Sequence, residues 1–174
     1  MKNKLAALSF VLSAAVIGLT LSGCATYKLG SMLPPEIRTV YVPTFLNETD
    51  EPFIEIDATR ATVQALKIDG SLRLAGSPEI ADSILKVTIV GYQLEPITYD
   101  TVRRTAANEY RLLISARVLL TNSKTGAVIA ENPLIQGEST FDVAGDFTSS
   151  KARGLPAAVR DLGSRIVPAV VEAW

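Results

Sequence analysis

The first 24 residues limit what this chain can fold into, because they hold its longest apolar run and its only cysteine. Lys2 and Lys4 form a basic start, residues 5–21 are almost all apolar or small, and Cys24 follows. This order is typical of a cleaved secretory signal, and the apolar run of about 17 residues is marginal for a membrane span, which needs about 20. We therefore expect an exported domain after Cys24 that no internal disulfide stabilises.

The end of this segment, Leu21-Ser22-Gly23-Cys24, resembles the lipobox of bacterial lipoproteins, in which the chain is cut before the cysteine and its thiol is acylated. The resemblance implies a signal peptide over residues 1–23 and a lipidated Cys24. Several acyl chains anchor a protein stably, since each buried methylene contributes about 0.8 kcal/mol. In such lipoproteins an Asp after the cysteine retains the protein in the inner membrane, so Ala25 implies the periplasmic face of the outer membrane. The alternative is an uncleaved anchor with an incidental cysteine.

The remaining chain has the size of one domain behind a short tether. The tether, residues 24–36, ends in Pro34-Pro35-Glu36. It extends to about 40 Å at most, which keeps the domain close to the membrane. Residues 37–174 suffice for a single hydrophobic core and are too few for two comfortable ones.

Composition excludes several classes of function. The chain has 17 basic and 18 acidic residues, so no basic excess would attract nucleic acid. It has no histidine and one cysteine, which removes Ser-His and Cys-His nucleophiles and the usual zinc ligand sets. We therefore expect a protein that is not an enzyme and uses no metal or cofactor. The alternative is an acid/base pair among Glu48, Asp50 and Glu51, loop acids that equally suit solvent or a helix cap.

Alternation of apolar and polar residues predicts a sheet. The expected strands are residues 37–42, 83–94, 109–121 and 127–141, with a doubtful short strand at 71–74. Residues 109–121 alternate most regularly and lead into a hairpin loop, in which Gly126 suits a left-handed position. Glu95-Pro96 should end the second strand. Pro133 predicts an edge position or a bulge in the last strand, since proline cannot donate to a ladder.

Two amphipathic helices are expected, over residues 52–68 and 152–174. At helical spacing, the first would bury Ile54, Ala58, Ala61, Ala65 and Ile68, and the second Leu155, Val159, Leu162, Ile166, Val170 and Ala173. Asp50 or Glu51 is the expected cap of the first helix. Residues 142–150 are expected to form a polar loop before the second.

These elements predict a two-layer α+β sandwich, with a mostly antiparallel sheet of about four strands and both helices on one face. The other sheet face must be solvated or must meet a partner. Its expected apolar side chains are Ile84, Val90, Tyr92, Leu113 and Leu119. They either contact a partner or are the single exposed apolar residues found on most protein surfaces.

Six short motifs, in this order and spacing, resemble the lipopolysaccharide-assembly lipoproteins, or LptE family, over about residues 24–141. They are Val40-Tyr41-Val42-Pro43, Asn47-Glu48-Thr49, Ala81-Asp82, Tyr99-Asp100, Glu109-Tyr110-Arg111-Leu112 and Gly126-Ala127-Val128-Ile129. Members of this family plug the lumen of the outer-membrane barrel LptD and are not enzymes. The resemblance implies that this chain binds LptD, assists its assembly and helps insert lipopolysaccharide into the outer leaflet.

The resemblance also implies that basic loop residues contact lipopolysaccharide. Arg103 and Arg104 are adjacent in the loop after Tyr99-Asp100, and Lys124 lies in the hairpin loop. Their charged groups suit phosphate. The alternative is that all three are solvated loop charges.

Another periplasmic outer-membrane lipoprotein, such as an activator of a peptidoglycan synthase, is the alternative to the barrel plug. Such activators also carry a strand and loop like residues 42–47 and an Ala-Asp like Ala81-Asp82. They usually need a long disordered linker to reach their partner, and residues 24–36 do not provide one.

Overall fold

The computed structural model describes residues 33–99 and 107–172, which contain six strands and two helices. In chain order these are β1 (Thr39–Tyr41), β2 (Leu46–Asn47), α2 (Ile54–Asp69), β3 (Arg73–Leu74), β4 (Ser83–Tyr99), β5 (Ala107–Asn122), β6 (Val128–Asp142) and α3 (Phe147–Val171). Cys24, Arg103 and Arg104 lie outside the described residues. Within the described residues, neither helix is both long enough and apolar enough to cross a membrane.

The sheet is mixed, with the order β3-β1-β4-β5-β6, and β2 also pairs with β4. The long strands β4, β5 and β6 are antiparallel, whereas β1, β2 and β3 pair in parallel. The prediction of about four mostly antiparallel strands is therefore wrong in strand number and in pairing. The parallel strands have two or three residues, too few to show a periodicity, and α2 supplies the crossover that parallel β1 and β3 require.

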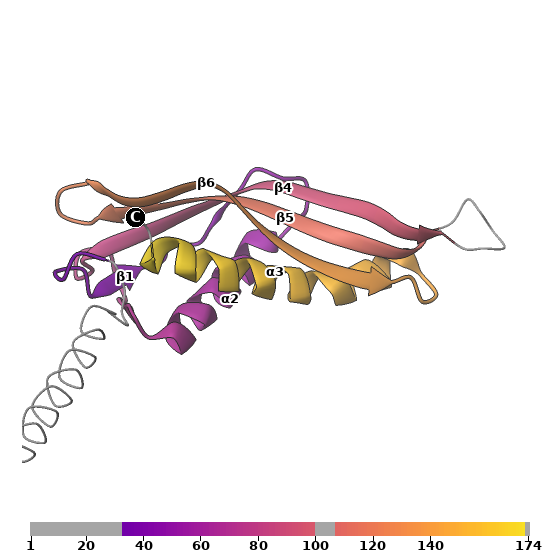
Figure 1. Cartoon of the computed structure of the whole chain (residues 1–174), viewed down its shortest axis with the longest axis horizontal. Helices are drawn as coiled ribbons and strands as arrows, with labels where there is room; N and C mark the ends of the chain where they lie inside the picture. Colours follow the sequence, from indigo (N-terminus) through magenta and orange to yellow (C-terminus); the bar gives the residue numbers. More distant parts are fainter. Residues whose placement is uncertain (1–32, 100–106, 173–174) are drawn as a thin grey trace, which may run out of the picture. The chain divides into compact units, whose positions relative to one another are not determined.

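The helices cover one face of the sheet, and α3 runs along β5 and β6 with α2 packed against it (Figure 1). This confirms the two-layer α+β arrangement. The core lies between the layers. Its largest fully buried side chains are Ile54, Leu66, Leu85, Ile89, Leu112, Ile114, Leu120, Leu162 and Ile166.

A bulge in β4 changes which side chains face the helices. Leu85, Val87 and Ile89 are buried, pairing with β5 then skips Val90, and Tyr92 packs against the core. One inserted residue reverses the alternation, so both sets face the same layer. The predicted position of Tyr92 on the open face is therefore wrong.

Strand β4 also continues through Pro96 to Tyr99, although Glu95-Pro96 was expected to end it. Strand β5 lies along one side of β4. On the opposite side, β1 pairs with Ser83 and Ile84, and β2 pairs with Thr88 and Ile89. Beyond these residues β4 is a sheet edge within the described part of the chain. A proline is tolerated there because its missing donor faces no neighbouring strand.

The first helix is rotated from its predicted orientation. Ile54 and Ala58 are buried as expected, but Thr62 and Leu66 complete the buried face, and Ile68 is 79% exposed. Leu66 is larger than Ala65, so turning it inward buries more apolar area. The predicted cap is also wrong, since Phe53 is the N-cap residue and no side chain caps the helix.

The last helix begins at Phe147, earlier than predicted, within the expected polar loop. The Asp146 carboxylate accepts hydrogen bonds from the amides of Thr148 and Ser149, both at 2.9 Å. The Phe147 ring packs edge-on against Tyr110, with 5.1 Å between centroids. A side-chain cap and an aromatic contact thus stabilise a first turn that carries no helical periodicity. The expected buried face from Val159 to Val170 is confirmed.

The hairpin and the edge strand agree with the sequence analysis. Gly126 has a φ of 70° in the turn, and β6 is the outermost strand beside β5. The pairing shifts between Ala116 and Val118, opposite Pro133. Helix α3 approaches this strand most closely at Gly137, where an added Cβ would lie 2.4 Å from the Leu162 amide nitrogen.

Asp82 connects three parts of the sheet. Its carboxylate oxygen Oδ2 accepts hydrogen bonds from the Arg38 amide at 3.1 Å, the Thr39 amide at 3.0 Å and the Thr39 hydroxyl at 2.8 Å. Its own amide donates to that hydroxyl at 2.9 Å. The Ser123 amide donates to the Asp82 carbonyl at 3.0 Å. Asp82 thus fixes β1 and the β5–β6 turn against the start of β4.

Gly137→Ala is expected to lower the free energy of unfolding by about 2 kcal/mol or more, because a helix backbone cannot move aside as a flexible side chain can. Gly76→Ala is the control, since a Cβ added there would have no atom within 4 Å and the φ of Gly76 is not positive. Urea denaturation of both variants measures the difference. Equal stability of the two variants would contradict close packing of α3 on β6.

Asp82→Asn is expected to lower the Tm at neutral pH, with a loss that shrinks below about pH 4. The Thr39 hydroxyl and then the Arg38 amide hold the pKa of Asp82 below its usual 3.8. A carboxyl whose pKa is lowered on folding stabilises the fold above its unfolded pKa, and this contribution disappears as the pH falls through the folded value. Thermal melts across this range test it. Asp142→Asn, which removes an exposed carboxylate at the end of β6, is the control for the loss of one negative charge.

Candidate functional site

The open face of the sheet, opposite the helices, is the largest candidate for recognition. On β5, Leu112 and Ile114 are fully buried toward the helices, whereas Leu113 and Leu119 point the other way and are half-buried. Ile84 and Val90 on β4 have the same partial exposure. The register places Ile84 diagonally beside Leu119, and Val90 near Leu113. Four of the five residues predicted for this face thus form two apolar pairs.

Two further leucines are exposed, Leu46 on this face and Leu134 at the sheet edge formed by β6. Leu46 pairs with Thr88 on the open side of β4 and is 66% exposed, and Leu134 on β6 is 56% exposed. Sequence reasoning missed both. Leu46 follows Phe45 between the expected strand at 37–42 and the expected helix at 52–68, and the two residues of β2 are too few to show an alternation. Leu134 follows Pro133, where the bulge interrupts the alternation of inward and outward side chains along β6.

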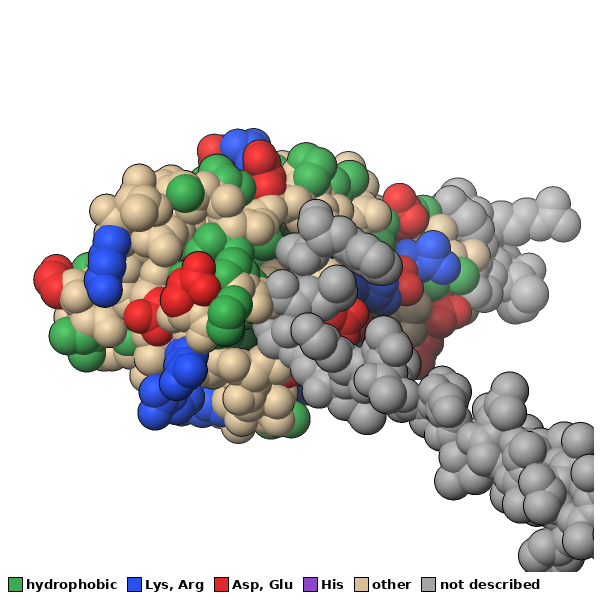
Figure 2. All heavy atoms as spheres, turned by 60° about the vertical axis from the view of Figure 1, so that its left-hand side comes forward, with side chains coloured by type: hydrophobic (Ala, Val, Ile, Leu, Met, Phe, Trp, Pro, Cys, Tyr) green, Lys and Arg blue, Asp and Glu red, His purple; other side chains and the backbone are tan. Residues whose placement is uncertain are grey.

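Polar contacts separate the apolar pairs. The Gln136 amide nitrogen donates to the Ser115 hydroxyl at 3.1 Å. Arg111 lies 3.8 Å from the Glu138 carboxylate, and Arg117 lies 3.9 Å from that of Glu48. The open face is therefore a mixed surface, like that of proteins that bind one another without being permanent partners. The part of the surface drawn in Figure 2 likewise intersperses apolar, acidic and basic side chains.

Two of the three loop acids considered as an acid/base pair form ion pairs. Glu51 forms an ion pair with Lys151 at 2.8 Å, and Glu48 faces Arg117. Lys151 also lies 5.6 Å from the centre of the Tyr92 ring. Burial, and then the Glu51 charge, raise the pKa of Tyr92 to about 12. In the described residues no group of three or more acidic, Cys or His side chains is placed to hold a metal ion. Glu48 and Glu51 therefore act as ion-pair partners.

Lys124, the one described residue of the basic set, is exposed at the β5–β6 turn. Its amide donates to the Asn122 side chain at 2.9 Å. Residues 100–106, which include Arg103 and Arg104, connect Tyr99 to Ala107, at the other end of β5. A strand of 16 residues spans about 50 Å. Lys124 is therefore about the length of β5 away from Ala107, which follows the segment that contains the two arginines.

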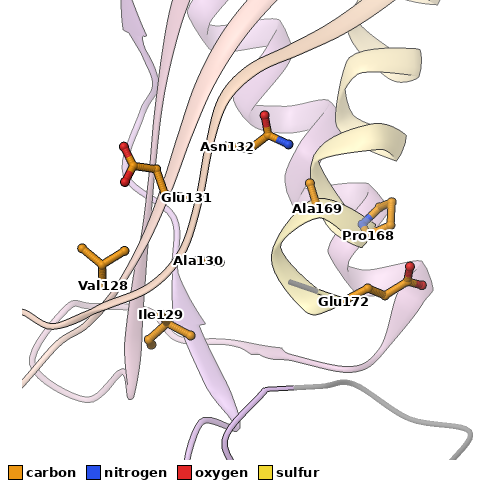
Figure 3. A pocket seen from close by; sticks show the side chains of 8 residues that line it. All are labelled: Val128, Ile129, Ala130, Glu131, Asn132, Pro168, Ala169 and Glu172. Carbon is orange, nitrogen blue, oxygen red and sulfur yellow. The ribbon is translucent and has the colours of Figure 1, made fainter. Parts of the chain in front are cut away.

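A cleft of about 640 Å³ separates the start of β6 from the end of α3 (Figure 3). Its lining residues are Val128, Ile129, Ala130, Glu131, Asn132, Pro168, Ala169 and Glu172. Figure 3 shows the Asn132 side chain directed toward α3 and Glu131 directed away from it. Asn132 also accepts a hydrogen bond from the Leu134 amide at 3.1 Å. This lining offers carboxylates but no cation to bind a phosphate, so the cleft is a poor candidate for a lipopolysaccharide site.

Comparisons with known proteins agree with this architecture. The crystal structure of a protein from Xanthomonas campestris is similar with a TM-score of 0.55 and 11% identity, over 78% of this chain and 85% of that one. A minor lipoprotein from Acinetobacter baumannii gives a TM-score of 0.51 and 11% identity, over 80% of this chain and 94% of that one. At such identities the likeness establishes the fold alone. No curated protein sequence matches the chain.

The family comparison is more specific than the structural one. The family model described as lipopolysaccharide-assembly, LptE, matches residues 37–169. This match covers both helices almost completely and every strand of the sheet. Because it also covers well over half of the sequence, the chain belongs to the lipopolysaccharide-assembly (LptE) family.

Proposed function

We propose that this protein is an outer-membrane lipoprotein that plugs the lipopolysaccharide-export barrel LptD. In this proposal the signal peptide ends at residue 23, acylated Cys24 holds the chain on the periplasmic face, and residues 37–174 form the plug. The role is one of binding: the protein assists assembly of the barrel and helps it insert lipopolysaccharide into the outer leaflet. Membership of the family supports the role of residues 37–174, and the lipobox-like Leu21-Ser22-Gly23-Cys24 supports the cleavage and the acylation.

The observation that carries the proposal is the open face of the sheet. A plug inside a barrel meets a polar, water-filled wall. It therefore needs polar contacts distributed among apolar ones, which the Ile84–Leu119 and Val90–Leu113 pairs and the polar contacts of Ser115 and Arg117 provide. The helix-covered face has no such exposed sheet surface.

Basic groups at the two ends of β5 are proposed to contact lipopolysaccharide phosphates. Arg103 and Arg104 suit bidentate phosphate binding, and Lys124 supplies a point charge. Because β5 separates the two locations, we assign them to two separate contacts along the lipid's route. The arginines are the principal contact, since two adjacent guanidinium groups bind an anion more strongly than one ammonium group.

The barrel assignment is tested by purifying the acylated protein from gently solubilised outer membranes and identifying what accompanies it. A stoichiometric LptD-type barrel is the expected result. The double variant Leu113→Gln, Leu119→Gln should reduce the recovered barrel about tenfold, because both leucines lie on the open face. Ile68→Gln, which changes an exposed residue of α2, is the matched control and should recover as much barrel as wild type. Recovery of a peptidoglycan synthase instead would favour the alternative assignment.

Charge reversal tests the lipid contacts. Arg103→Glu with Arg104→Glu should weaken lipopolysaccharide binding about tenfold or more, because each lost contact is a charge-assisted hydrogen bond. Lys67→Glu with Arg160→Glu is the control, since it makes the same change in net charge at exposed helix positions. Binding of labelled lipopolysaccharide to the purified proteins measures both. Equal binding by the two double variants would remove the arginines from the lipid contact.

A further inference from the structure

Phe53 has an unusual backbone conformation. It is the one residue other than glycine with a positive φ, 64°, in the described part of the chain. Bulky side chains rarely occupy this left-handed region, because the side chain crowds its own backbone. Yet the ring is 71% exposed, so packing in the core does not account for the residue at this position.

The surrounding loop fixes this conformation. The Asn47 amide nitrogen donates to the Glu51 carbonyl at 2.8 Å, and its oxygen accepts from the Thr49 amide at 2.9 Å and from the Thr49 hydroxyl at 2.7 Å. Glu51 is held in turn by Lys151 of α3 at 2.8 Å. These contacts bind residues 47–51 to the body of the protein and so hold the backbone that leads to Phe53.

The surroundings of the ring are apolar and acidic. Ile56, whose amide donates to the Phe53 carbonyl at 3.1 Å, is 44% exposed. Residues 47–57 contain no Lys or Arg and carry the acidic residues Glu48, Asp50, Glu51, Glu55 and Asp57. Ion pairs engage Glu48, Glu51 and Asp57. Asp50 and Glu55, on either side of Phe53 in the sequence, have no basic partner among the described residues.

We propose that Phe53 is an aromatic anchor that enters an apolar pocket on the barrel protein, where Lys or Arg side chains of the barrel meet Asp50 and Glu55. This inference rests on the proposed function and assigns it a contact residue. Aromatic side chains held in place before binding are the usual energetic centres of interfaces, because little freedom is lost when they dock. A membrane surface is a poorer occupant, since anionic lipid headgroups repel the two carboxylates.

The test compares variants of the full acylated protein for recovery of the barrel and for Tm. Phe53→Ala and Phe53→Gly should each reduce the recovered barrel about tenfold or more, and Phe53→Trp should retain it. Phe53→Gly should not lower the Tm, because glycine adopts a positive φ without strain. It therefore separates lost contact from lost folding. Ile68→Ala, which removes a 79% exposed side chain at the other end of α2, is the matched control.

Cross-linking identifies what the ring touches. With p-benzoylphenylalanine replacing Phe53, the expected adduct is with the barrel, and the same group replacing Ile68 should give none. An adduct with lipid, or undiminished barrel recovery by Phe53→Ala and Phe53→Gly, would overturn the anchor while leaving the plug assignment intact. If the wild-type protein itself recovers no barrel, the proposed function and the anchor both fail.

Discussion

Three long strands present one face of apolar side chains, and α3 is the helix that buries it. Leu112, Ile114 and Leu120 of β5 are completely inaccessible beneath it. This burial requires a residue without a side chain at position 137, because α3 lies so close to β6 that a Cβ at Gly137 would clash with it. Helix α2 then packs on α3, where Gly163 allows a similarly close approach to the backbone of Ala61 and Thr62. The second helix is thus positioned by the first.

Covering one face so completely leaves the other available. Helices on a single side mean that the open face is solvated unless a partner meets it. Leu113 and Leu119 are half-buried by their own neighbours, Leu46 is mostly exposed, and ion pairs lie among them. Such a surface tolerates water before association and still loses apolar area on binding. The loop around Phe53 differs, because it concentrates apolar area in one exposed ring.

The sequence predicted the features that repeat along the chain. Regular alternation in residues 109–121 and the spacing from Val159 to Val170 led to the correct buried faces, and Pro133 marked the edge strand. Three features with no repeating signal were missed. They are the strand β2 with the parallel pairing of β1, β2 and β3, the bulge at Val90, and the first turn of α3, which depends on the Asp146 cap and on Tyr110, distant in sequence. Of the site, Ile84, Val90, Leu113 and Leu119 were found, but Phe53 was not, because backbone strain leaves no pattern in composition.

The exposed edge of β6 affects what happens when copies of this protein meet one another. Lipid anchoring confines a protein to two dimensions, where copies meet far more often than they would in free solution. An unprotected sheet edge would then template chain-to-chain pairing. Here Asn132 accepts a hydrogen bond from the Leu134 amide, Asp161 accepts one from the Glu138 amide at 2.8 Å, and Pro133 has no amide hydrogen to donate. In the proposed lipid-anchored state, these features leave neighbouring copies without a continuous β6 edge for strand pairing.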